Sequence, residues 1–82
     1  MKINNRAMMR NHGPFDSEKW IRDLFSSRAA RDGQVVRRNL RDIDKYVGRE
    51  RFAQELSRRG FRAIENSGQI VIFCNQEPIR RF

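Results

Sequence analysis

The sequence is poor in the residues that catalytic and metal sites require. Its 82 residues include one cysteine, Cys74, and one histidine, His12. A single cysteine excludes an internal disulfide, and its place in the apolar run Gln69–Asn75 predicts a buried, unreactive thiol. His12 has no companion at ligand spacing, and the glycines form no phosphate-cradling loop. We therefore expect no metal, no cofactor and no enzymatic activity, a nuclease included.

Long hydrophobic runs are also absent. The longest, Ile70–Cys74, has five residues, against the roughly 20 that cross a bilayer. The first fifteen residues contain Lys2, Arg6 and Arg10 but lack the apolar segment of a secretory signal. The sequence thus predicts a cytoplasmic protein without a membrane partner.

Arginine is the residue that the chain has in excess. Fifteen arginines stand against three lysines, and with ten acidic residues the formal net charge is +8. The planar guanidinium suits phosphate and stacks on flat rings, so this composition favours nucleic acid as the partner. A merely solvated basic surface is the alternative interpretation. Neither arginine cluster is expected to be interleaved with exposed aromatic residues, so a stacking platform for single strands has little support in the sequence.

The pattern of apolar residues predicts a single α+β domain over residues 16–82, preceded by a flexible basic arm over residues 1–15. The expected order is helix, strand, helix and hairpin. Helices on one face of a mostly antiparallel sheet of three or four strands would make a small two-layer sandwich.

The first helix is expected over residues 16–31. Asp16 and Ser17 are its candidate N-caps, and Trp20 and Phe25 recur at the spacing of a core-facing stripe. Both aromatic side chains are therefore predicted to lie in the core.

A short strand is expected over residues 34–38, followed by helical sequence from Asn39, a plausible N-cap, to Arg59. Gly48 interrupts the apolar stripe of this segment. Residues 39–59 therefore form either one kinked helix or two helices.

Two hairpin strands are expected over residues 61–65 and 69–75, joined by the three-residue turn Asn66-Ser67-Gly68. The second strand is apolar on both faces, which predicts a central position in the sheet. Beyond it, Ile79–Phe82 is either a short edge strand or a tail.

Acidic residues in the second half of the chain stand close to arginines. Asp42 and Asp44 are expected to complement a helix N-terminus and neighbouring arginines. Glu50 and Glu55 are placed to pair with arginines of the same helix, namely Arg49, Arg51, Arg58 and Arg59.

Two arginine groups flank the segment 39–59. If that segment were one helix, it would separate them by about 27 Å, a length that could bridge phosphates across a groove. Arg58 and Arg59 would also suit the negative end of a helix dipole. The predicted nucleic-acid ligands are Arg37, Arg38, Arg41, Arg58, Arg59 and Arg62, with Lys2, Arg6 and Arg10 of the arm.

The competing hypothesis is a protein-interaction module, either an accessory subunit or a small inhibitor that docks on an acidic protein surface. Strand addition by Ile79–Phe82, or docking by Met8-Met9, would then make the contact. The sequence leaves the choice of RNA or DNA and the oligomeric state open.

Several segments resemble a set of short bacterial proteins, chiefly alphaproteobacterial, over roughly residues 20–79. The similar segments are Leu24–Arg31, Gly33–Arg38, Val47–Phe52, Arg58–Phe61 and Gly68–Asn75. Members often carry the name phosphoribosylanthranilate isomerase. That isomerase is a (β/α)₈ barrel of at least about 200 residues, so the name does not describe the chemistry of this chain.

A second, shorter resemblance involves Leu56–Phe61, Gly68-Gln69 and the apolar strand after them. These residues are similar to the helix and hairpin of HicA-type mRNA interferase toxins. The resemblance implies a fold like that of double-stranded-RNA-binding domains, with a catalytic histidine directly after the hairpin glycine. Gln69 occupies that position here, which puts the implied cleavage in doubt.

Overall fold

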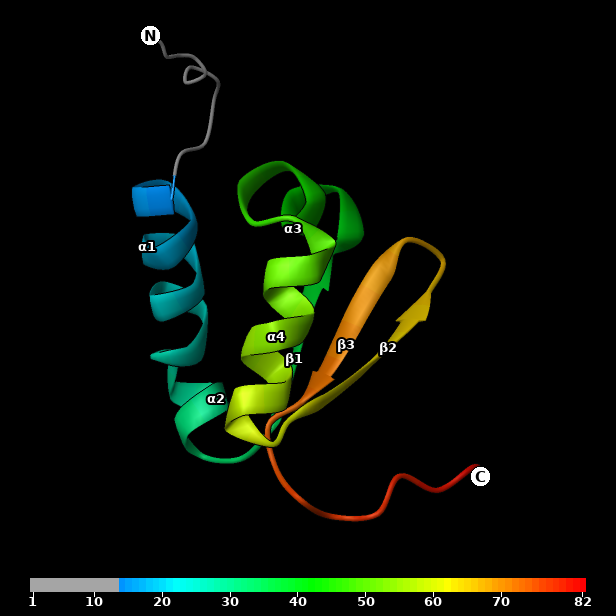
Figure 1. Ribbon diagram of the computed structural model, residues 1–82. Coiled ribbons are helices and arrows are strands. Elements are labelled where there is room, and N and C mark those ends of the chain that lie inside the picture. Colours follow the sequence, from blue (N-terminus) through cyan, green and yellow to red (C-terminus); the bar gives the residue numbers. More distant parts are fainter. Residues whose placement is uncertain (1–13) are drawn as a thin grey trace, which may run out of the picture.

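Within residues 14–82, the part of the chain that the computed structural model describes, four helices and three strands form. In chain order they are α1 (Pro14–Phe25), α2 (Arg28–Arg31), β1 (Val35–Asn39), α3 (Leu40–Tyr46), α4 (Arg49–Arg59), β2 (Arg62–Asn66) and β3 (Gln69–Phe73). Figure 1 shows the helices gathered on one side of the sheet. The predicted α+β class with an antiparallel sheet is confirmed.

The strand that comes last in the chain, β3, lies in the middle of the sheet. The strand order is β1-β3-β2, and β3 runs antiparallel to both neighbours. The edge strands β1 and β2 are therefore parallel to each other but never touch. The central position predicted for the apolar strand is confirmed.

The register assigns each strand residue to one face, because residues paired across neighbouring strands point to the same side and successive residues alternate. Val36 pairs with Ile72, and Ile72 pairs with Ala63. Ile72 is completely buried and Val36 is buried, so this row faces the helices. Val35 and Phe73, one residue away, therefore lie on the opposite face, which the described helices leave open (Figure 1).

The core between the two layers is apolar and contains aromatic pairs. Ile21, Leu24 and Phe25 of α1 are buried, and Phe25 stacks on Phe52 of α4 with ring centroids 6.2 Å apart. Burying a side chain of this size contributes about 1.5–3 kcal/mol. Trp20 packs at the edge of the core, which confirms the core assignment of both predicted aromatics.

The first helix starts earlier and ends earlier than predicted. It begins at Pro14, whose missing N–H is harmless in a first turn, so two residues of the predicted arm belong to it. Ser17 is not a cap: its buried hydroxyl donates to the Tyr46 carbonyl at 2.9 Å. The helix stops at Phe25, and Ser27 caps the separate short α2 by accepting from the Ala30 amide at 3.3 Å.

The residues between β1 and β2 form two helices rather than one. Gly48 lies between them with φ +93° and ψ 143°, a conformation nearly confined to glycine. Its amide donates to the Ile43 carbonyl at 2.7 Å and closes α3. Asn39 is the N-cap residue of α3, but its side chain makes no capping hydrogen bond. The amide of Leu40 donates instead to the Gly68 carbonyl at 2.8 Å.

The hairpin turn is one residue shorter than predicted. Asn66 pairs with Gln69, so only Ser67 and Gly68 form the loop. Both have positive φ angles, 51° and 76°, which is the pattern of a type I′ turn. The segment 79–82 forms no strand, so of the two alternatives it is the tail.

Replacing Gly48 with alanine is expected to lower the free energy of unfolding by about 1–3 kcal/mol. No atom lies within 4 Å of the added Cβ, so the loss comes from backbone strain at φ +93° alone. Urea unfolding followed by circular dichroism measures it. Gln54→Ala, at an exposed position of α4, is the control and should change stability by less than about 0.5 kcal/mol. Equal stability of the two variants would contradict the assignment of Gly48.

Candidate nucleic-acid interface

A buried carboxylate, Glu55, gathers three arginines of α4. Its side chain is 1% exposed. Arg51, Arg58 and Arg59 stand three or four positions away, on the same side of the helix. Arg51 Nη1 donates to Oε1 at 3.0 Å, while Arg58 Nη2 and Arg59 Nε donate to Oε2. The predicted pairing of Glu55 with these arginines is confirmed, and two predicted phosphate ligands thereby have an internal partner.

The same arginines connect α4 to α1. Arg51 donates to both carboxylate oxygens of Glu18, each at 2.9 Å, in the two-pronged geometry that strengthens such pairs. The Arg59 guanidinium lies 4.5 Å from the centroid of the Phe25 ring. Arg51 and Arg59 are therefore part of the fold, whereas Arg58 keeps 68% of its side chain exposed.

The arginines decide the charge state of Glu55. Burial alone would raise the pKa of this carboxyl, but the hydrogen bonds from Arg58, Arg59 and Arg51 outweigh it and lower the pKa to about 2. The pKa of Arg51 is raised in turn by its hydrogen bonds to Glu18 and Glu55. Glu55 and Arg51 are therefore ionised throughout the neutral range.

Another predicted ligand, Arg62, holds the segment that follows β3. Its Nη2 donates to the carbonyls of Asn75 at 3.0 Å and of Glu77 at 2.6 Å. These bonds fix the path of the chain as it leaves the sheet. Both hydrogen bonds use Nη2. Within residues 17–82, Nε and Nη1 of Arg62 donate to no acceptor.

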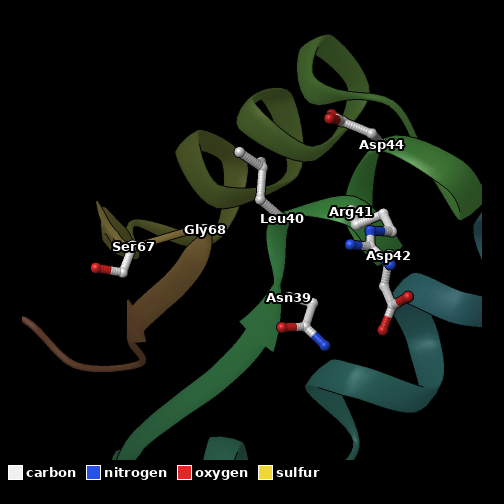
Figure 2. A pocket seen from close by; sticks show the side chains of 7 residues that line it. All are labelled: Asn39, Leu40, Arg41, Asp42, Asp44, Ser67 and Gly68. Atoms are coloured by element: carbon white, nitrogen blue, oxygen red, sulfur yellow. The ribbon is translucent and has the colours of Figure 1, made fainter.

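The other three arginines of the predicted clusters lie at the end of β1 and the start of α3. Arg37 is on the open face of the sheet, and Arg38 is on the helix side, where its Nη1 donates to the Arg37 carbonyl at 2.6 Å. A hollow of about 490 Å³ opens there between α3 and the β2–β3 turn, lined by Asn39, Leu40, Arg41, Asp42, Asp44, Ser67 and Gly68 (Figure 2). A second hollow of about 210 Å³ is lined by Arg37, Arg38, Asn39, Asp42 and Gln69. The two adjoin, because Asn39 and Asp42 line both.

Three arginines and two aspartates line the two hollows together. Within residues 17–82, no carboxylate forms an ion pair with any of the three arginines. Asp44 is already bound by Arg49, with Nε and Oδ1 2.9 Å apart, which confirms its expected pairing with a neighbouring arginine. Asp42 lies in the first turn of α3, where a carboxylate is favoured. The lining of the two hollows thus includes three arginines and one aspartate, Asp42, that form no ion pair within residues 17–82.

The expected geometry of the two arginine groups is wrong in one respect. Gly48 divides residues 39–59 into two helices, so no straight helix of about 27 Å separates the groups. The arm residues Lys2, Arg6 and Arg10 lie outside the described residues.

Sequence reasoning missed an aromatic side chain beside the arginines. Phe73 lies between Val35 and Arg62 in one row of the open sheet face. Along the chain, the aromatic residue within an arginine cluster, Phe61, packs against the core, whereas across the sheet Phe73 lies beside Arg62. Alternation from the buried Ile72 could have indicated the outward side of Phe73, but not which residues flank it, because that depends on the register.

Other kinds of site find little support in the described residues. Cys74 is buried, and burial raises the pKa of its thiol, as expected for an unreactive cysteine. Nowhere in residues 17–82 do three or more histidine, cysteine or acidic side chains gather in a way that could hold a metal ion. Over residues 14–82, no helix is long and apolar enough to cross a membrane.

Comparisons with protein-family models, with curated proteins and with solved structures found no match. The two resemblances noted in the sequence therefore stay predictions.

Acid should destabilise the fold through Glu55. Its pKa is 4.5 as an ordinary carboxyl and about 2 in the folded protein, so it stabilises the fold fully above about pH 5. That contribution, up to about 3 kcal/mol, is lost as the pH falls toward 2. Urea unfolding at a series of pH values from 7 to 2 measures it.

Glu55→Gln should reduce this acid dependence and lower stability at neutral pH by up to about 3 kcal/mol, because a neutral amide cannot make the contribution that the ionised carboxylate makes above about pH 5. Glu50→Gln, at an exposed position of the same helix, is the matched control and should behave as the unaltered protein. The assignment fails if Glu55→Gln retains the full acid dependence.

Proposed function

We propose that the protein binds nucleic acid without acting on it, with Arg37, Arg38 and Arg41 contacting phosphates. The observation that carries the proposal is that these arginines line two adjoining hollows where β1 enters α3, Arg41 the larger one and Arg37 and Arg38 the smaller one. Guanidinium groups without a carboxylate partner can bind phosphate oxygens in pairs. The net charge of +8 adds long-range attraction and the release of condensed counterions.

The two arginine groups have different roles in this proposal. Arg59 and Arg62 have internal partners and mainly maintain the fold, while the exposed Arg58 adds positive charge. A double variant Arg58→Ala/Arg59→Ala would therefore disturb the compensation of Glu55 along with any phosphate contact. The group around β1 and α3 offers a test of binding that leaves this buried pair intact.

The alternative function is docking on an acidic protein surface. It is favoured by one observation: Ile79 and Phe82, beyond Pro78, are exposed and belong to no strand. An accessory subunit or inhibitor would bury these side chains against its partner.

The triple variant Arg37→Gln/Arg38→Gln/Arg41→Gln should weaken binding to nucleic acid. Fluorescence anisotropy with labelled single strands and duplexes of RNA and DNA, over a series of salt concentrations, measures the affinities. The unaltered protein should bind more weakly as salt rises. Loss of three phosphate contacts should reduce the slope of log affinity against log salt by about 2–3.

A charge-matched control separates a local site from diffuse attraction. Arg22→Gln/Arg28→Gln/Arg31→Gln removes the same charge from exposed positions of α1 and α2 and should have the smaller effect. Equal losses in both triple variants would contradict a site at β1 and α3. Absence of binding to every strand at low salt would reject the proposed function and favour an acidic protein partner.

A further inference from the structure

The open face of the sheet presents a regular array of nine side chains. The register arranges them in three rows across the strands: Val35, Phe73 and Arg62; Arg37, Val71 and Ile64; and Asn39, Gln69 and Asn66. The first two rows combine apolar side chains with one arginine each, and the third consists of amides alone. This face therefore has an apolar and cationic part and a polar part.

The apolar part of the open face does not belong to the core. Val35 and Ile64 are 44% and 48% exposed on the two edge strands. Phe73 and Val71 lie between them on β3, half-buried, and neither packs against the buried core. Arg37 and Arg62 flank this pair from opposite edges, about 12 Å apart, because they are separated by two strand spacings across the sheet and by two residues along the strands. An aromatic ring is thus bordered on either side by a strand that carries a guanidinium group.

The polar row continues into the surface that we propose for phosphate binding. Asn39 and Gln69 belong to this row and also line the hollow that contains Arg37 and Arg38. Amide side chains offer both donors and acceptors, as the edges of unpaired bases do. The open face and the arginine hollows are therefore one continuous surface.

The charges on this face argue against a second copy of the chain as its occupant. Two such faces in contact would bring Arg37 and Arg62 of each copy together, in molecules that each carry a net charge of +8. A polyanion relieves this repulsion, and flat bases match a half-buried ring on the open face and guanidinium planes. A duplex keeps its bases stacked internally and cannot lay them on the sheet.

We infer that the open sheet face binds single-stranded nucleic acid. One base stacks on Phe73, Arg37 and Arg62 bind the flanking phosphates, and the amide row contacts base edges. Arg62 can do so through Nε and Nη1 while Nη2 keeps the segment after β3 in place. This inference rests on the proposed function and deepens it, because it selects single strands over duplexes.

The test compares Phe73→Leu with the unaltered protein, using labelled single-stranded oligonucleotides and duplexes of the same sequence. Leucine keeps an apolar side chain on the open face but has no ring. Affinity for single strands should fall at least about fivefold, the lower end of the loss of one stacked base. Affinity for duplexes should stay unchanged. Ultraviolet cross-linking to a uridine-rich strand, with identification of the linked peptide, should place the bond at Phe73.

Two further measurements keep the test decisive. Circular dichroism and the thermal midpoint show that Phe73→Leu is folded. Arg37→Gln is compared with Arg22→Gln, which removes the same charge from α1 on the helical layer, and only the former should weaken binding to single strands strongly.

The outcomes separate the two proposals. Normal single-strand affinity in a folded Phe73→Leu variant, while the triple variant at Arg37, Arg38 and Arg41 binds weakly, would overturn the stacking site alone. No binding of any nucleic acid by the unaltered protein would overturn both proposals. A dimer that Phe73→Leu converts to monomers, with unchanged affinity for single strands, would assign the face to self-association instead.

Discussion

The helical layer depends on a single buried negative charge. A carboxylate as deeply enclosed as Glu55 would lose several kcal/mol of hydration, so it persists only because three guanidinium groups surround it. Two of those groups extend the linkage: Arg51 reaches Glu18, and Arg59 covers the ring of Phe25. The helices α1 and α4 are thus joined by charge as well as by apolar contact. In a chain this short, whose core is small, such a network also restricts how the two helices can slide.

This constraint divides the arginines into two populations that composition alone cannot distinguish. Those at the end of α4 neutralise an internal acid, and those at the end of β1 have no carboxylate partner within residues 17–82. A count of charges treats them alike, and so does a search for clusters along the chain. The difference between the two populations arises because Glu55 is buried in the tertiary structure. The candidate site is therefore no longer at both ends of the segment 39–59, as predicted, but at the end of β1 and on the open face of the sheet.

Local sequence features predicted the elements well where local physics decides them. The β-branched pair before Asn39 and the apolar run after Gly68 became strands, and Gly60 ends α4 in a left-handed conformation. The pairing of Glu55 with arginines of its own helix could also be predicted, because it depends only on separations of three and four residues along the helix. Predictions failed where distant residues intervene. Ser17 binds a carbonyl of α3 instead of capping its own helix, and the position of Phe73 beside Arg62 follows from a strand register that periodicity cannot supply.

The strand order has a consequence for synthesis of the protein. Both edge strands bond only to β3, and β3 is the last of the three to leave the ribosome. The helices can form early from local contacts, whereas β1 must wait through the whole intervening segment for its partner. During that interval β1 and β2 have unpaired backbone groups that invite wrong partners. The three-stranded sheet can therefore form only after β3 is complete, and its open face is available to a ligand only from then on.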